Sequence, residues 1–265
     1  MYLSFLNSSM DISVVIPHYN SSDLLLMALN SIDRQTYLPK EVIVVDDCSS
    51  PIHKTALLEA EKLTFQFKLI ILFQQENKGA PTARNFGISH AGGEYIALLD
   101  ADDCWVDNKL EQQLSAIGDF DFLYGRYKSF KSEVTQVDLP QSACPIRYFD
   151  IFKKNLSPVT LLMKREAFVP FDERLRRCDD FKMSLEALYK GRSIGFLHTD
   201  LAYGFKKSVG EGGLTGSLIK MSLSFIHACL LLALEYPRLS FLMIFFIFFE
   251  LLKFPIRCIK VLLKK

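Results

Sequence analysis

The sequence predicts an α/β fold with a doubly wound, mostly parallel β-sheet. Up to about residue 127, apolar runs of strand length alternate with stretches in which apolar residues recur at helical spacing, the pattern of a parallel sheet covered by helices. Polar residues follow the first, second and fourth of these runs, as "HYN", "DDCSS" and "DADD". Ligands of such sheets bind beyond the carboxyl ends of the strands, so we expect a functional site on that rim.

The predicted elements follow one another in a regular order. The expected strands cover residues 12–17, 41–46, 67–74, 94–100 and 120–127, and the helices between them cover 21–33, 55–63 and 81–91. A looser second unit contains a strand-like segment at 159–163 and an amphipathic helix that starts at Asp179. With 265 residues, of which 49% are hydrophobic and 23% charged, the chain can form one sizeable domain with an appendage.

Charge and cysteine content exclude several classes of protein. The net charge of +1 gives no overall basic field, so no nucleic-acid partner is expected. The six cysteines are scattered without a CxxC pair or zinc-ligand spacing, which indicates free thiols in a reducing compartment. The opening segment "MYLSFLNSSMD" lacks the basic region and the long apolar region of a signal peptide. We therefore expect the bulk of the protein to be cytoplasmic.

The composition changes after the glycine-rich "GEGGLTG", which divides the chain into a domain at 1–216 and an apolar, basic-ended extension at 217–265. The uninterrupted apolar run "FLMIFFIFF" has nine residues, fewer than the ~20 that a membrane-spanning helix needs. Its aromatic residues are followed by five cations: Lys253, Arg257, Lys260, Lys264 and Lys265. We expect helices that lie peripherally on the inner face of the cell membrane. The alternatives are a hairpin packed on the domain, a homo-oligomer contact and a spanning helix.

Three aspartates end the fourth predicted strand, in "EYIALLDADDCW". An unpaired buried carboxylate costs several kcal/mol, so Asp100, Asp102 and Asp103 need a compensating charge. Two carboxylates one residue apart can hold Mg²⁺ or Mn²⁺ when a substrate diphosphate completes the coordination shell. The alternative is that Asp102 or Asp103 caps the helix that contains "VDNKLEQQL".

Five motifs together resemble family 2 glycosyltransferases. They are "ISVVIPHYN", "EVIVVDDCSS", "NKGAPTARNFGI", "GEYIALLDADDCW" and "FDERLRRCDDFKMSLEAL", in the family's order over residues 11–205. The resemblance implies the GT-A fold, a UDP-sugar donor held with Mn²⁺ or Mg²⁺, and inverting transfer of a hexose or N-acetylhexosamine. It points to a lipid-linked saccharide acceptor in bacterial surface-polysaccharide synthesis, such as an O-antigen of lipopolysaccharide or a capsule.

Two functions compete with this one. A polyprenyl-phosphate glycosyltransferase would use the same donor chemistry on a different acceptor, and a non-catalytic nucleotide-sugar-binding subunit would not need a metal ligand or a base. The sequence argues against a third candidate, a sugar-1-phosphate nucleotidyltransferase. Such an enzyme would carry a glycine-rich phosphate loop after the first strand, and "PHYNSS" offers none.

The resemblance assigns donor contacts at the ends of the first two strands. Pro17 and Tyr19 are similar to residues that wall the nucleobase, although Tyr19 could also be an ordinary buried aromatic. Asp47 resembles the carboxylate that accepts a hydrogen bond from the uracil imide. The alternative interpretation of "DD" is that one aspartate forms a turn with its side chain, and Asp46 is the better candidate for this turn residue. Cys48 stands where the family usually has glycine.

Further donor contacts are assigned around the third helix and the acidic motif. Gly79 permits a close approach of the backbone. Arg84 can pair with the diphosphate or brace Asp100, or it can form an ordinary surface salt bridge. Asp100 resembles the acid that contacts ribose and water near the metal, and Asp102 resembles the direct metal ligand.

The catalytic base is assigned to the motif "CDDF". Inversion needs a base on the face opposite the leaving nucleotide, and the resemblance places Asp180 in that role. Asp179 replaces the family's usual glutamate, and both residues could also simply begin a helix. Trp105 either lines the sugar or acceptor pocket or anchors a helix.

Overall fold

The computed structural model describes residues 10–134, 142–154, 156–205 and 218–262. In these ranges a nine-stranded sheet has the order β3-β2-β1-β4-β8-β6-β9-β5, with β7 paired to β9. The strands are β1 Ile12–His18, β2 Glu41–Asp46, β3 Lys68–Phe73, β4 Tyr95–Leu98, β5 Asp103–Trp105, β6 Phe122–Lys128, β7 Cys144–Pro145, β8 Leu162–Lys164 and β9 Ile194–Gly204. The helices are α1 Ser22–Asp33, α2 Pro51–Glu61, α3 Ala80–Ser89, α4 Lys109–Ile117, α5 Tyr148–Lys153, α6 Asp179–Tyr189, α7 Leu218–Glu235 and α8 Ser240–Leu262.

Strand directions bring the functional ends together. β3, β2, β1 and β4 are mutually parallel, as predicted. β8 is antiparallel to both β4 and β6, so β6 runs in the direction of β4, and β9 is parallel to β6. The carboxyl ends of β1, β2, β4, β6 and β9 therefore share one edge of the sheet, called the carboxyl edge below. The sheet as a whole is mixed, because the short strands β5, β7 and β8 run antiparallel to their neighbours.

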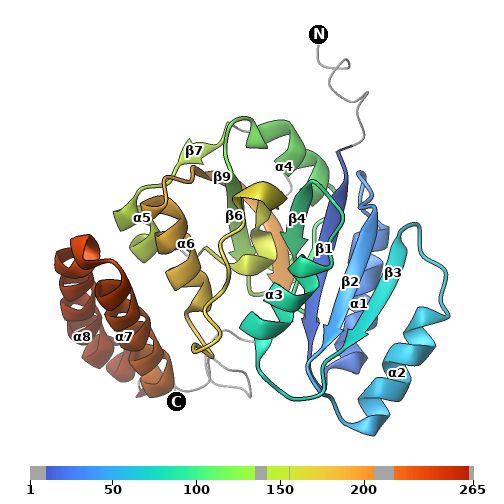
Figure 1. The fold of residues 1–265 in the computed structure, drawn as a ribbon, viewed down its shortest axis with the longest axis horizontal. Helices are drawn as coiled ribbons and strands as arrows, with labels where there is room; N and C mark the ends of the chain where they lie inside the picture. Colours follow the sequence, from blue (N-terminus) through green and yellow to red (C-terminus); the bar gives the residue numbers. More distant parts are fainter. Residues whose placement is uncertain (1–9, 135–141, 155, 206–217, 263–265) are drawn as a thin grey trace.

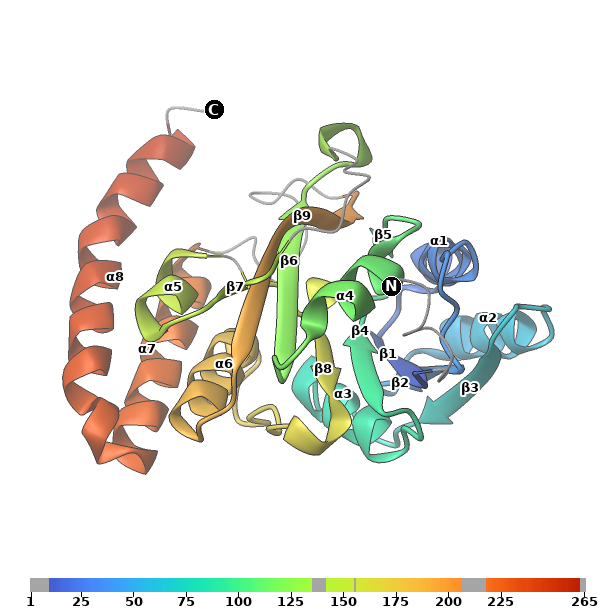
Figure 2. The same cartoon turned by 90° about the horizontal axis from the view of Figure 1, so that it is seen from above.

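Helices cover both faces of the sheet (Figures 1 and 2). Along β1, Val14 and Ile16 point into the core beneath α1, α2 and α4, whereas Val15 points into the core on the side of α3 and α6. Both faces of the strand are buried, which explains its almost continuously apolar sequence. The α/β fold class predicted from the sequence is confirmed.

Element boundaries differ from the predicted ones where capping chemistry or strand length decides. α2 begins at Pro51, four residues earlier than expected, since proline is well suited to the first turn of a helix. β5 and β8 have three residues each, too few for a clear period-2 pattern. α6 begins at Asp179, as predicted.

The two C-terminal helices form a hairpin, α7 and α8 with the turn at 236–239, that packs against α5 and α6 (Figure 1). The rings of Phe152 and Phe246 stack with centroids 4.8 Å apart, and those of Phe181 and Phe225 lie 4.6 Å apart. α8 has 23 residues because the helix continues beyond "FLMIFFIFF" and through Pro255. Both helices are long and apolar enough to cross a membrane, so the length argument against a spanning helix was wrong. The proposed domain boundary at 216/217 lies outside the described residues.

Candidate active site

Arg84 joins two parts of the site from its position on α3. Its Nη2 donates to Oδ1 of Asp100 at 2.8 Å, and its Nη1 donates to Oδ2 of Asp179 at 3.0 Å. The arginine side chain is only 7% exposed, so the surface salt-bridge interpretation is wrong. A forked guanidinium suits this task because it can hold two carboxylates in fixed directions. Arg84 thereby connects the end of β4 to the beginning of α6.

Asp179 and Asp180 occupy the first turn of α6. Oδ1 of Asp180 accepts a hydrogen bond from the Phe181 backbone N–H at 2.8 Å, so this residue also contributes to the helix start. Burial and the neighbouring Asp179 raise the pKa of Asp180 to about 7. Burial also raises the pKa of Asp179. The aspartate side chain, although shorter than the family's usual glutamate, still reaches Arg84. A carboxylate with a pKa near neutrality suits proton abstraction at neutral pH.

Asp47 shapes the turn that leads into α3. Its Oδ1 accepts from the Lys78 N–H at 2.8 Å and its Oδ2 from the Gly79 N–H at 2.7 Å. A carboxylate has about four acceptor positions, so these bonds leave capacity for a base edge. Gly79 has φ +95° and ψ 166°, a conformation that essentially only glycine adopts. An added Cβ would also lie 2.9 Å from Nη1 of Arg176.

The ends of β1 and β2 present one exposed aromatic ring above a buried polar pair. Tyr19 is 52% exposed, so its interpretation as a buried aromatic was wrong, whereas Pro17 is half-buried in β1. His18 lies between them, with its Nδ1 3.0 Å from Oδ1 of Asp46 on β2. Oδ2 of Asp46 accepts from the Ser49 N–H at 3.1 Å, the local turn contact expected of this residue.

The acidic turn after β4 lies on the carboxyl edge. Asp100 and Asp102 are partly exposed there, whereas Asp103 belongs to β5. Oδ1 of Asp103 accepts from the Tyr127 hydroxyl at 2.8 Å. Burial and the charges of Asp103, Asp102 and Asp100 raise the pKa of Tyr127. The capping interpretation was wrong, because α4 begins only at Lys109, after Asn108.

The acidic turn offers carboxylate oxygens that suit a hard divalent cation. Arg84 occupies one oxygen of Asp100, and the side chain of Asp102 lies two residues further along the turn. Within the described ranges, no group of three or more His, Cys, Asp and Glu side chains could hold a metal ion. This donor set fits an Mg²⁺ or Mn²⁺ site that takes one or two ligands from the protein and the rest from a diphosphate and water.

Trp105 is a core residue. It is fully buried, and its Nε1 donates to the Val159 carbonyl at 2.8 Å. The interpretation of Trp105 as a sugar platform was therefore wrong. Sequence reasoning missed Tyr127, Asn85 and Lys182. The contacts of Tyr127 with Asp103, of Asn85 with Phe171 and of Lys182 with Glu235 join residues 24 to 86 positions apart, and no local pattern marks such contacts.

A family profile decides the relationship that the motifs suggested. The profile of "Glycosyl transferase family 2" matches residues 13–183, which is more than half of the chain and runs from β1 through the acidic turn into α6. The chain belongs to this family. It is accordingly a transferase of the glycosyltransferase class, and the predicted family membership is confirmed.

Bacterial relatives align with about two thirds of this family 2 protein. "UDP-Glc:alpha-D-GlcNAc-diphosphoundecaprenol beta-1,3-glucosyltransferase WfgD" of Escherichia coli is 30% identical over 182 residues, which cover 67% of this chain and 69% of WfgD. "Amylovoran biosynthesis glycosyltransferase AmsB" of Erwinia amylovora is 31% identical over 189 residues, covering 66% of this chain and 63% of AmsB. Both relatives are named as bacterial sugar transferases, and AmsB is named for amylovoran biosynthesis.

Solved structures share the fold. S. aureus TarS 1–349, in complex with UDP-GlcNAc, has a TM-score of 0.66 at 24% identity over 84% of this chain and 67% of that one. Mannosyltransferase PcManGT from Pyrobaculum calidifontis, in complex with GDP-Man and Mn²⁺, has a TM-score of 0.65 at 17% identity over 82% of this chain and 62% of that one. The predicted GT-A fold is confirmed.

Proposed function

We propose that this family 2 glycosyltransferase moves a hexose or an N-acetylhexosamine from a UDP-sugar to a hydroxyl of a lipid-linked saccharide, with inversion. The product would enter a bacterial surface polysaccharide such as an O-antigen or a capsule. The observation that carries the proposal is the buried Arg84 bridge, which fixes Asp100 on the acidic turn relative to Asp179 beside the candidate base Asp180. The name of the relative WfgD supports a UDP-sugar donor and a diphospholipid-linked acceptor.

The donor would lie along the carboxyl edge between β1 and β4. Tyr19 exposes its ring for stacking on the base, Pro17 supports it, and Asp47 keeps acceptor capacity for the imide N–H. The backbone at Gly79 leaves room for the close approach of a phosphate-bearing ligand. Asp102 and Asp100 would hold Mn²⁺ or Mg²⁺, which supplies positive charge to the leaving diphosphate when bound.

Asp180 would act as the general base. The deprotonated carboxylate accepts the proton of the acceptor hydroxyl while that oxygen attacks the anomeric carbon and the bond to the diphosphate breaks. Its raised pKa of about 7 makes it a stronger base than an ordinary aspartate. Asp179 and Arg84 keep α6 at a fixed place relative to the donor side of the site.

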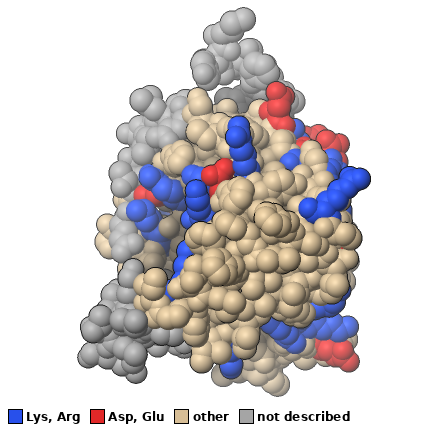
Figure 3. Space-filling view, turned by 90° about the vertical axis from the view of Figure 1, so that its left-hand side faces the viewer, with Lys and Arg blue, Asp and Glu red and all other residues tan. Residues whose placement is uncertain are grey.

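The outer face of the hairpin would contact the membrane. It exposes large apolar side chains on both helices: Ile219, Leu223, Leu230, Leu234, Phe241, Ile244, Phe248, Leu251, Leu252 and Ile256. Figure 3 views this side of the molecule and shows a broad uncharged face bordered mainly by Lys and Arg, with fewer Asp and Glu. A contiguous apolar face of this kind, bordered by cations, suits an anionic lipid surface.

A peripheral position fits the contacts of the hairpin better than a spanning one. Glu235 at the end of α7 pairs with Lys182 on α6 at 2.6 Å, and the hydroxyl of Tyr236 donates to Glu186 at 2.7 Å. A spanning hairpin would carry its turn across the bilayer and break both contacts. We therefore propose that the protein lies on the cytoplasmic face of the cell membrane.

A homo-oligomer formed through the same apolar face is the alternative. Light scattering of the detergent-solubilised protein distinguishes the two.

Transfer assays test the proposed function. Purified protein is given a panel of nucleotide-sugars with a lipid-linked saccharide acceptor or with polyprenyl phosphate, in the presence of Mn²⁺ or of EDTA. We expect transfer from a UDP-sugar to the saccharide, loss of that transfer in EDTA, and weaker metal-dependent UDP binding in Asp102→Ala.

The base assignment is tested by Asp180→Asn. This variant should lose more than about 100-fold in transfer rate, the usual contribution of a general base, while UDP binding stays nearly unchanged. Transfer to polyprenyl phosphate alone would favour the rival acceptor, and full activity of Asp180→Asn would rule out the assigned base.

A further inference from the structure

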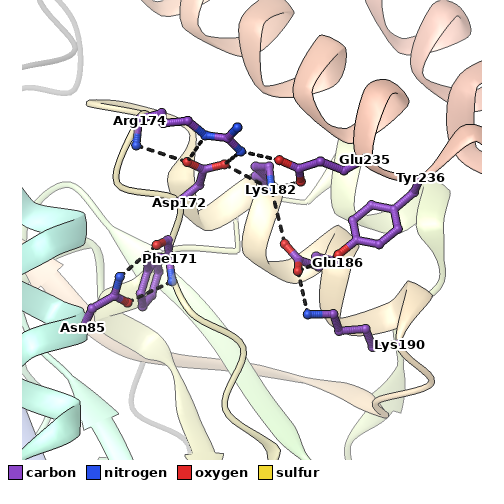
Figure 4. Close-up of polar contacts among 9 residues, drawn as sticks. All are labelled: Asn85, Phe171, Asp172, Arg174, Lys182, Glu186, Lys190, Glu235 and Tyr236. Atoms are coloured by element: carbon purple, nitrogen blue, oxygen red, sulfur yellow. Dashed lines mark hydrogen bonds and ion pairs between the residues drawn. The ribbon is translucent and has the colours of Figure 1, made fainter.

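A cluster of charged side chains joins the hairpin to the helix that carries Asp180 (Figure 4). The members of this charge cluster are Asp172, Arg174, Lys182, Glu186, Lys190 and Glu235. They come from three segments: the loop that precedes α6, α6 together with Lys190 directly after it, and the last residue of α7. Three cations face three carboxylates, and Glu235 of α7 supplies the negative charge that makes the cluster neutral.

Lys182 is the central member of the charge cluster. Its side chain is 3% exposed, and its Nζ lies 2.6 Å from Oε2 of Glu235, 3.2 Å from Oδ2 of Asp172 and 3.2 Å from Oε2 of Glu186. Arg174 supports the same arrangement, because it pairs with both Asp172 and Glu235. Buried charges are poorly screened by water, so each partner strongly restricts where the others can lie.

The charge cluster acts on the helix turn that contains the candidate base. Lys182 follows Asp180 by two residues, and the ring of the intervening Phe181 packs against Phe225 of α7 at 4.6 Å. On its sheet side, α6 is held by the 3.0 Å contact between the hydroxyls of Ser184 and Tyr124. The hairpin therefore supplies the contacts on one side of this helix, and the sheet supplies those on the other.

A second path leads from the charge cluster to Arg84. Phe171, next to Asp172, exchanges two backbone hydrogen bonds with the amide of Asn85: its N–H donates at 2.9 Å and its carbonyl accepts at 2.8 Å (Figure 4). The ring of Phe171 lies 5.5 Å from the guanidinium carbon of Arg84. Asp172, which pairs with Lys182, therefore lies next to a residue that packs beside Arg84. Arg84 in turn holds Asp179.

We propose that Lys182 and Glu235 are positioning residues for Asp180, so that the hairpin belongs to the catalytic apparatus as well as anchoring the protein. This inference rests on the proposed function. The ion pair fixes the position of α6, and with it the direction in which the Asp180 carboxylate meets the acceptor hydroxyl. A misplacement of about 1 Å at such a position can lower a rate by about 100-fold.

The experiment compares full-length variants in the transfer assay on lipid vesicles. Lys182→Met should lower kcat at least about 10-fold with the KM for the UDP-sugar within about twofold of wild type, because the donor side of the site is untouched. Lys182→Arg keeps the charge and should recover most of the rate. Lys190→Met is the matched control: this lysine follows the last turn of α6, at the opposite end from Asp180, and among the described residues its ion pair is with Glu186, so its kcat should stay near wild type.

Glu235→Gln provides a second variant in case Lys182→Met does not fold. Glu235 is partly exposed, so its replacement is tolerated more easily, and its kcat should fall in the same direction. Rates are expressed per folded molecule, measured by circular dichroism and by UDP binding. Unchanged kcat in folded Glu235→Gln and Lys182→Met would overturn the inference while leaving the proposed function intact. If wild type transfers no sugar from any donor, the proposed function fails and this inference falls with it.

Discussion

At the scale of single residues, two of the positions with a positive φ lie beside Asp47. Gly79 has φ +95° and Cys48 has φ +61°, but only the first is a glycine. A side chain in the left-handed region costs roughly 1–2 kcal/mol because its Cβ crowds the following carbonyl. The departure from the family pattern at Cys48 thus places backbone strain in the turn that carries Asp47.

We predict that Cys48→Gly is more stable than Cys48→Ala by about 1 kcal/mol. Both variants lose the thiol and its contact with the Gln75 carbonyl, so their difference isolates the backbone conformation. Urea unfolding followed by circular dichroism measures it. Equal stability of the two variants would show that the turn relaxes out of the left-handed region at no cost.

Asp180 predicts a pH dependence of activity. Burial and Asp179 raise its pKa to about 7, and only the ionised carboxylate can accept a proton. We expect kcat/KM to fall about tenfold for each pH unit below this value. A pH–rate profile from pH 5 to 9 with saturating metal measures this decrease in kcat/KM. A flat profile through neutrality would contradict the assignment of Asp180 as the base.

The same raised pKa predicts a trade between function and stability. Because the pKa is higher in the folded state than in the unfolded state, ionised Asp180 opposes folding above pH 7, and this opposition fades as the pH falls toward the unfolded value. Asp180→Asn should therefore raise the melting temperature at pH 8 more than at pH 5. Thermal unfolding at the two pH values gives the comparison.

At the scale of elements, α4 is held by an unusual buried lysine. The Nζ of Lys109 donates to Oε1 of Gln113 at 2.6 Å and lies 4.0 Å from the centre of the Trp105 ring. Burial lowers the pKa of Lys109 well below its usual range. The folded protein then binds fewer protons than the unfolded chain between the lowered pKa and the usual value near 10.5, so stability rises with pH across that window.

We predict that Lys109→Met stabilises the protein at pH 7 by about 1 kcal/mol, because methionine fills a similar volume without a group that must lose its proton. The gain should shrink toward pH 10, where the unfolded lysine also becomes neutral. Chemical unfolding at pH 7 and pH 9.5 measures the change. A gain that is independent of pH would mean that packing, not protonation, is responsible.

Which elements could be predicted depends on how much of their environment is local. β1 and β2 were predictable since their interiors are almost continuously apolar, and the start of α6 was predictable from acids before an amphipathic run. The antiparallel direction of β8 was not predictable, because its three residues carry no information about the neighbouring strands β4 and β6. The pairing of Arg84 with Asp100 was among the alternatives predicted from the sequence, whereas the second bond of Arg84, to Asp179, is visible only in three dimensions.

At the scale of the whole molecule, the hairpin gives the protein one strongly apolar side. Phe241 is 85% exposed, and Ile244 and Phe248 lie on the same helix with more than half of their surface exposed. The cations Lys253 and Arg257 lie further along α8. Lys264 and Lys265, which were expected to contribute to this basic end, lie outside the described residues.

We predict that the full-length protein floats with vesicles containing anionic lipid, and that the triple variant Phe241→Asp, Ile244→Asp and Phe248→Asp binds at least about tenfold more weakly, because each side chain loses its burial in the lipid interface. Ile52→Asp on α2 is the control, an exposed apolar residue far from the hairpin in sequence. Equal flotation of the triple variant and wild type would place the membrane contact elsewhere.

The position of β8 in the chain separates the residues assigned to the donor from the candidate base. The residues assigned to the donor, from Pro17 to Asp102, all precede β8 in the chain, whereas Asp180 follows it. Under the proposed function, we therefore expect substitutions after β8 to change which alcohol is glycosylated while the preference for the nucleotide stays the same. The pair of Arg84 and Asp179 spans this divide, so it is the contact that any such exchange has to preserve.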